Sequence, residues 1–160
     1  MFKYLAILII TTTVSCTSTK PLVKVNNEDF KLISFDAVSK SLSFNNFEQS
    51  QLNLYGKKLI SEWYNQKIKT NGIEGSLNVN VNKLETLAVK NNENYKITVY
   101  ISINFEVLNN TLDTKKSFDV SASEFAEISG SFSIQDQDNL SINTIKKAIS
   151  KISDELYKLI

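Results

Sequence analysis

Histidine and arginine are both absent from the 160-residue chain, and cysteine and proline occur once each. Without histidine the chain lacks the usual general base near neutral pH and the commonest metal ligand, so a Ser-His-Asp triad is excluded. Without arginine it has no planar guanidinium group for bidentate binding of phosphate or carboxylate groups. A single cysteine cannot form an intrachain disulfide, so the hydrophobic core must provide the stability.

Glycine and net charge are also low. The four glycines, at positions 56, 72, 75 and 130, are too scattered to build a phosphate-binding loop. The formal charge is +1, and loss of Lys3 with residues 1–15 would leave 17 basic and 17 acidic residues. A neutral chain has no general attraction for nucleic acid, so no nucleic-acid partner is expected.

The acidic residues offer no metal site in the sequence. Residues 136–139, Asp-Gln-Asp-Asn, lack the central glycine and terminal glutamate of a calcium loop. We expect Asp136, Asp138 or Ser141 to cap the following helix instead. The sequence thus predicts no enzyme, no cofactor and no metal.

Residues 1–15 have the pattern of a secretory signal peptide. Lys3 supplies a positive charge, residues 4–10 are apolar, and three threonines follow. Spanning a bilayer takes about 20 apolar residues, so this segment is too short for a lasting transmembrane helix.

Residues 13–16, Thr-Val-Ser-Cys, resemble the lipobox of bacterial lipoproteins. Val14, Ser15 and Cys16 match that motif, whereas Thr13 stands where leucine is usual. The resemblance implies cleavage between Ser15 and Cys16, a diacylglyceryl thioether on Cys16 and a third, amide-linked acyl chain such as palmitate. Two or three acyl chains hold a protein firmly to a membrane. The alternative is an ordinary signal peptide with an incidental cysteine.

The lipobox resemblance also implies a location and a domain plan. It places the protein in the cell envelope, anchored to a membrane through Cys16 and facing the periplasm. Thr17 follows the cysteine, where aspartate favours inner-membrane retention in enteric bacteria, so the outer membrane is favoured. We expect a tether over residues 16–30 and a single domain over residues 31–160.

A first helix is expected over residues 46–70. Residues 46–49 form a capping-box pattern in which the Asn46 side chain meets the backbone at Gln49. Apolar residues then recur at three- and four-residue steps: Leu52, Tyr55, Leu59 and Trp63, widened by Ile60, Tyr64 and Ile68. Gly72, in a left-handed conformation, is expected to end the helix.

Alternation with a period of two predicts three strands after this helix. The first begins at Ser76, and the second is the clearest in the sequence. Its apolar face comprises Tyr95, Ile97, Val99, Ile101, Ile103, Phe105 and Val107. A third strand begins near Phe118, and the break in alternation at Phe125 is interpreted as a β-bulge.

The C-terminal segment predicts a second helix that packs on the sheet. Its apolar residues step by three and four: Ile142, Ile145, Ile149, Ile152, Leu156 and Leu159. With a short strand near Leu22 or over residues 31–35, the predicted order is β-α-β-β-β-α. The predicted fold is an α+β sandwich, an antiparallel sheet of three to four strands with both helices on one face.

Two surfaces are candidates for binding. The polar face of the long strand, with Lys96, Tyr100 and Asn104, either faces solvent or receives a protein partner. The alternative is a ligand cleft between helix and sheet, lined by aromatic residues that otherwise belong to the core: Tyr55, Trp63, Tyr64 and Tyr95.

The segment from Trp63 onward resembles an uncharacterised group of small alphaproteobacterial lipoproteins. The shared features are a helix with tryptophan, Gly72, strands, the Ser-Ala-Ser-Glu run at residues 121–124 and a long last helix. The architecture also resembles the lipopolysaccharide-assembly lipoprotein and auxiliary lipoproteins of envelope transporters. These resemblances imply a non-catalytic accessory or scaffold in envelope assembly or transport, with an envelope protein as partner. The alternative function is binding of a small amphiphile.

Overall fold

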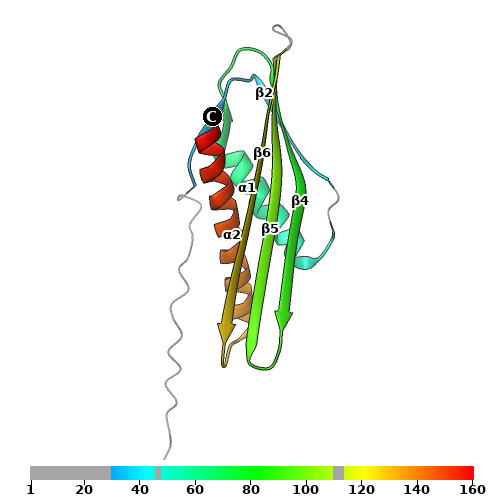
Figure 1. Cartoon of the computed structure of the whole chain (residues 1–160), viewed down its shortest axis with the longest axis vertical. Helices are drawn as coiled ribbons and strands as arrows, with labels where there is room; N and C mark the ends of the chain where they lie inside the picture. The colour runs from blue at the N-terminus through cyan, green and yellow to red at the C-terminus, as the bar shows by residue number, and fades with distance from the viewer. Residues whose placement is uncertain (1–29, 46–47, 110–113) are drawn as a thin grey trace, which may run out of the picture.

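A computed structural model describes residues 30–45, 48–109 and 114–160. A long sheet carries two helices on one face (Figure 1). The strands of this sheet are β2 Ser39–Phe44, β4 Ser76–Lys90, β5 Asn94–Asn109 and β6 Thr114–Ser129. The helices are α1 Gln51–Lys67 and α2 Ile134–Leu159. Two short strands, β1 Ile33–Phe35 and β3 Ile68–Thr70, form a separate parallel pair. The predicted α+β class and the order of strand, helix, three strands and helix are confirmed.

The main sheet has the strand order β2-β4-β5-β6. The last three strands are joined by two hairpins and run antiparallel, as predicted. β2 lies parallel to β4, with Ser39 opposite Ser76 and Phe44 opposite Val81. The pairing is parallel because the chain crosses over through α1 before it returns to the sheet.

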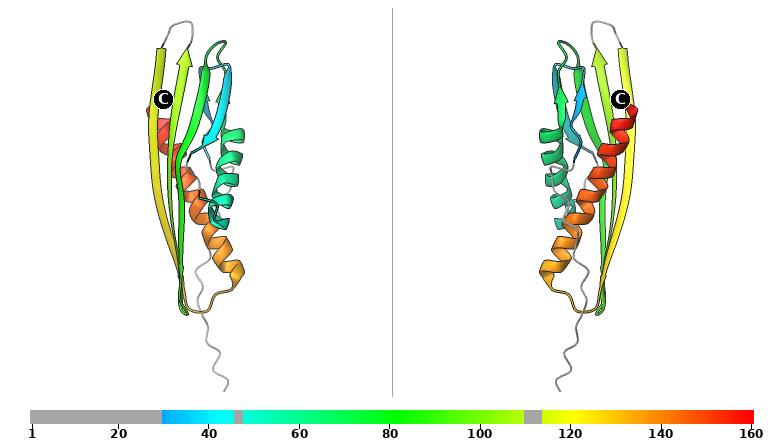
Figure 2. Two further views of the ribbon diagram at one scale, coloured as in Figure 1. Left: turned by 90° about the vertical axis from the view of Figure 1, so that its right-hand side faces the viewer. Right: turned by 90° about the vertical axis from the view of Figure 1, so that its left-hand side faces the viewer.

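The alternation of β5 is observed as predicted. Its inward side chains from Ile97 to Phe105 are almost completely buried, and the residues between them face away from the helices. The views in Figure 2 show why: α1 and α2 lie on the same side of the sheet. One face of β5 therefore contributes to the core and the other is open.

The β-bulge lies in β4, and its predicted position at Phe125 was wrong. The pairing of β5 with β6 runs without a shift from Asn94–Ser129 to Asn109–Thr114. Phe125 keeps the alternation and projects from the open face. The register shift lies between Val81 and Lys83, where it reverses the orientation of later β4 side chains.

Helix α1 is shorter than predicted at both ends. Asn46 lies outside the described residues, and the N-cap is Ser50, whose hydroxyl accepts a 3.1 Å hydrogen bond from the Asn53 N–H. The helix ends at Lys67 because Ile68 adopts an extended backbone and pairs with Ile33 of β1. The predicted end near residue 70 missed this pairing.

The two glycines that follow α1 are required for different reasons. Gly72 does not have the positive φ expected of a helix stop; a Cβ there would lie 2.5 Å from the backbone N of Ala37. Gly75 does have a positive φ, 82°, and its Cβ would lie 2.4 Å from the Leu108 carbonyl oxygen. Gly72 is required because another backbone segment approaches it closely. Gly75 is required both by a close backbone approach and by its positive φ.

Helix α2 begins with a capping box that includes Asp136, one of the three predicted capping residues. The N-cap is Ser133, and the Asp136 carboxylate accepts a hydrogen bond from the Ser133 backbone N–H at 2.8 Å. Asp136 thus belongs to the cap, whereas Ser141 faces the core and lies 2.9 Å from the Tyr95 hydroxyl. The predicted apolar strip is largely correct, with Ile145, Ile149, Ile152 and Leu156 buried.

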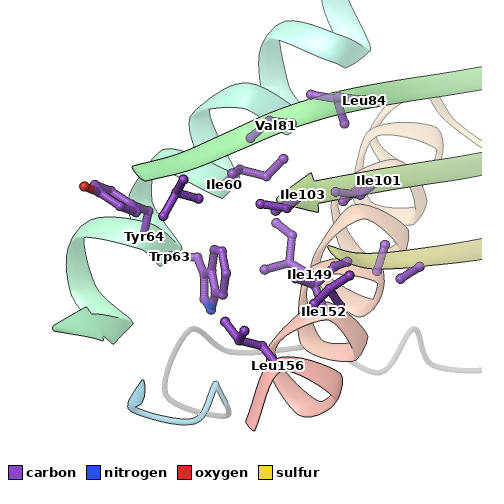
Figure 3. Close-up of a cluster of buried hydrophobic side chains, with 14 of the residues drawn as sticks. Ile60, Trp63, Tyr64, Val81, Leu84, Ile101, Ile103, Ile149, Ile152 and Leu156 are labelled. Atoms are coloured by element: carbon purple, nitrogen blue, oxygen red, sulfur yellow. The ribbon is translucent and has the colours of Figure 1, made fainter. Parts of the chain in front are cut away.

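The core lies between the two helices and the sheet. Figure 3 shows Trp63 of α1 among aliphatic side chains of β4, β5 and α2. Its indole meets the Phe105 ring edge to face, at 6.4 Å between centroids. The buried face of α1 is centred on Gly56, Ile60 and Trp63, so the predicted stripe was rotated: Leu52 and Leu59 are half-buried, and Tyr55 is exposed.

Candidate partner-binding surface

The three predicted surface residues lie on the open face of the sheet. Lys96, Tyr100 and Asn104 follow one another at every fourth position of β5 and point away from the helices. Lys96 is exposed, and the other two are half-buried among neighbouring strands. Among the described residues, no helix covers this face (Figure 2).

One end of the open face is a ladder of mutually satisfied polar side chains. Serine hydroxyls of β2 donate to asparagine amide oxygens of β4, from Ser41 to Asn78 at 2.9 Å and from Ser43 to Asn80 at 2.6 Å. Asn104 donates to Ser117 and to Asp119, both at 2.9 Å. Because these groups already have partners, this end fits a hydrated surface better than a binding site.

Tyr100 lies in the middle of the open face. It is paired with Glu85 on β4 and with Ser123 on β6. The Lys83 ammonium lies 4.9 Å from the ring centroid and also 3.0 Å from the Glu85 carboxylate. The Lys83 ammonium therefore contacts both the Tyr100 ring and the Glu85 carboxylate.

Beyond Tyr100 the open face carries exposed apolar side chains beside the charged residues Lys96 and Glu127. Three side chains form what we name the apolar sheet patch: Leu87, Val89 and Phe125, between 56 and 68% exposed. Leu87 and Phe125 flank Thr98 on its two sides, and Val89 flanks Lys96. The Lys96 ammonium lies 5.5 Å from the Phe125 ring centroid. Single exposed apolar residues are ordinary, but neighbouring ones on an uncovered face are typical of an interaction site.

Sequence reasoning missed this patch although one signal was present. The break in alternation at Phe125 marked an apolar residue on the polar face. Leu87 and Val89 could not be placed because the bulge after Val81 reverses the phase of β4. A bulge of this kind has no sharp signature in a single sequence.

The predicted aromatic cleft is not formed in the described part of the chain. Trp63, Tyr64 and Tyr95 are buried as core residues, and Tyr55 lies at the surface between the helices. The cavity beside Tyr55, also lined by Leu52 and Ile142, has a volume of about 10 Å³. That space holds at most about one water molecule and is too small for an amphiphile.

A larger groove follows the free edge of β6 beside α2. It has a volume of about 500 Å³ and is lined by Ser121, Ser123, Lys151, Glu155 and neighbours. Lys151 pairs there with Glu124 and donates to the Ser123 carbonyl oxygen at 3.4 Å. Because its charges are compensated, the groove offers no distinct recognition chemistry.

The predicted lipidation site, Cys16 with the cleavage position after Ser15, lies outside the described residues. Across residues 30–45, 48–109 and 114–160, no group of three or more acidic or cysteine side chains is placed to hold a metal ion. In the same ranges neither helix has the length and apolar character that crossing a bilayer requires.

No family model matches the chain, and no curated protein matches it. A minor lipoprotein from Acinetobacter baumannii is 9% identical over 76% of this chain and 93% of that one, with a TM-score of 0.42. A hypothetical protein from Chlamydia trachomatis is 9% identical over 81% and 95%, with a TM-score of 0.43. Rare lipoprotein B from Shewanella oneidensis is 12% identical over 76% and 98%, with a TM-score of 0.30. Likeness at this level neither assigns the chain to a family nor transfers an activity to it.

Proposed function

We propose that this chain is a lipid-anchored protein of the bacterial cell envelope that acts without catalysis, by binding another envelope protein on its open sheet face. The observation that carries the proposal is the apolar sheet patch, which projects from the face of the sheet opposite both helices. The proposed site is the outer membrane, with the domain in the periplasm and the anchor on Cys16.

The sequence around Cys16 supports the anchor. The chain's only cysteine stands directly after Val14-Ser15, where a lipobox requires it, and an apolar stretch of signal-peptide length precedes it. A thioether-linked lipid and an acylated amino group would supply two or three chains, enough for stable attachment.

The composition of the open face supports a protein partner. Protein interfaces place apolar and aromatic side chains at the centre and polar, hydrated groups at the rim. Here Leu87, Val89 and Phe125 form the centre, and Tyr100 and Lys96 adjoin them. We therefore expect a partner surface that presents apolar side chains to this patch.

Site-specific cross-linking in living cells tests the proposal. A photoreactive amino acid replaces Phe125 in the full-length protein, and Ser41, on the polar end of the same face, serves as the matched control position. We expect one envelope protein to be captured from Phe125 but not from Ser41, and capture should be lost in a Leu87→Ser, Val89→Ser variant. Cys16→Ala should also abolish capture, because the unlipidated protein is not held at the membrane.

Two outcomes would overturn the proposal. Capture of no protein, in cells where mass spectrometry finds lipid on Cys16, would contradict the proposal that a protein partner binds this face. Equal capture from Phe125 and Ser41 would show that the patch is not the binding surface.

A further inference from the structure

A second group of exposed apolar residues lies at the end of α2 and on the segment that Lys31 holds beside it. We name it the terminal cluster: Leu32, Tyr157, Leu159 and Ile160, each between 51 and 59% exposed. Lys31 joins its two chain segments, because its ammonium lies 4.7 Å from the Tyr157 ring centroid and 3.0 Å from the Asp154 carboxylate. Residues far apart in the sequence thus meet at one end of the domain.

The terminal cluster lies where the chain from Cys16 enters the domain. Phe30 is buried in the core, and the next residue, Lys31, is bound to the last turns of α2. Fourteen Cα-to-Cα steps separate Cys16 from Phe30, which limits the reach of the connection to about 50 Å. Among the described residues, Leu32 is the exposed apolar residue nearest in sequence to Cys16, and Lys31 connects it to the end of α2.

The chemistry of the terminal cluster suits the boundary between lipid headgroups and acyl chains. Aliphatic side chains bury there, tyrosine places its ring in the boundary and its hydroxyl in water, and lysine extends its ammonium to the headgroups. The nearby charges are balanced: Lys31 pairs with Asp154, and Lys158 with Glu155 at 2.7 Å. Attraction to a bilayer would thus come from apolar contact, with little dependence on anionic lipid.

We propose that the terminal cluster rests on the phospholipid surface of the membrane in which Cys16 is anchored, an inference that depends on the lipid anchor proposed above. Helix α2, which is about 39 Å long, then leads away from the bilayer, with its first residue, Ile134, at the far end. The apolar sheet patch lies toward this distant end, because β4 ends there at the hairpin to β5 (Figure 1).

Fluorescence in reconstituted vesicles tests this orientation. The lipidated full-length protein has its only cysteine blocked by lipid, so Leu159→Cys provides a unique labelling position for an environment-sensitive fluorophore. Ile134→Cys is the matched control, since this residue is also apolar, 74% exposed and on the same helix. In phosphatidylcholine vesicles containing a nitroxide-labelled lipid, we expect severalfold stronger quenching at position 159 than at position 134.

The outcomes separate this inference from the anchor itself. Mass spectrometry first detects lipid on Cys16, and flotation detects binding to the vesicles. If the lipid is absent, both the proposed anchor and the proposed orientation are contradicted. If the protein is lipidated and floats with vesicles but both labels are quenched equally or not at all, only the orientation is overturned. A Leu32→Ser change that severalfold reduces quenching at position 159 would support the contact.

Discussion

At the scale of single residues, the buried amide of Asn53 connects α1 to the sheet. Its Oδ1 accepts hydrogen bonds from the N–H of Thr86 at 3.0 Å and from the Thr86 hydroxyl at 2.7 Å, while its Nδ2 donates to the Glu48 carbonyl oxygen at 3.0 Å. Thr86 lies on β4 beyond the stretch that β2 covers. Asn53 therefore satisfies backbone and side-chain groups that the sheet itself leaves unpaired.

We expect Asn53→Leu to lower the free energy of unfolding by about 2–4 kcal/mol, because two buried donors on Thr86 lose their acceptor. Urea denaturation measures the change as a shift of the midpoint at constant slope. The control is Asn82→Ala, which removes an exposed amide that accepts from Asn45 at 3.3 Å and should change stability by less than about 0.5 kcal/mol. Similar effects of the two changes would contradict the role given to Asn53.

Asp136 at the start of α2 gives a prediction about pH. Hydrogen bonds from the backbone N–H and the hydroxyl of Ser133 hold the pKa of its carboxyl below the ordinary 3.8. A lowered pKa in the folded state means that the contribution to stability is complete above the ordinary pKa and disappears as pH falls through the lowered one. Asp136→Asn should therefore flatten the loss of stability between about pH 5 and pH 2.

Thermal unfolding followed by circular dichroism at several pH values checks this prediction. Asp138→Asn is the matched control, since it removes a carboxylate in the same turn that is not part of the capping box. An unchanged pH profile for Asp136→Asn would show that the cap contributes nothing.

Several of these residue-scale roles could not be predicted from sequence. The sequence identified Asp136 as one of three candidate capping residues because negative charge at a helix start is a local feature. It did not identify Asn53, whose partner is 33 positions away, or the close approach that requires glycine at position 72. Such roles depend on tertiary contacts, which a local pattern does not contain.

At the scale of elements, α2 is the main cover of the sheet. Ile152 lies completely buried on it, in the cluster of Figure 3. Ile152→Ala should lower the free energy of unfolding by about 2–5 kcal/mol, because it removes buried methyl groups and leaves a cavity. Ile134→Ala, on the exposed first turn, should stay within about 0.5 kcal/mol. Equal losses in urea denaturation would place the helix differently from Figure 2.

Elements with long, regular patterns were predictable, and those made by pairing were not. The uninterrupted alternation of β5 and the apolar steps of α2 each predict an element and its buried face. β3 was assigned to the helix because its residues Ile68–Thr70 continue a helical stripe, and only pairing with β1 makes them a strand. The open face was predicted with Lys96, Tyr100 and Asn104, but its apolar part depends on the bulge in β4.

At the scale of the whole molecule, one core connects all the larger elements. Trp63, the only tryptophan, is buried where α1 meets Phe105 of β5, and α2 closes the same cluster. Unfolding should therefore be a single cooperative transition, with Trp63 fluorescence and far-ultraviolet circular dichroism changing together. An earlier fluorescence transition would mean that α1 with β1 and β3 melts as a separate unit.

The parallel placement of β2 has a consequence for timing. Residues 39–44 of β2 pair with residues 76–81 of β4, whereas the three long strands join through hairpins between neighbours in the chain. If the chain is exported as proposed, with its N-terminal part first, β2 emerges well before its partner β4. Pairing between distant segments is also slow. Leu42 and Phe44, which pack against the core of the folded domain, would then stay exposed to solvent until β4 emerges. β2 would therefore emerge early and be buried late.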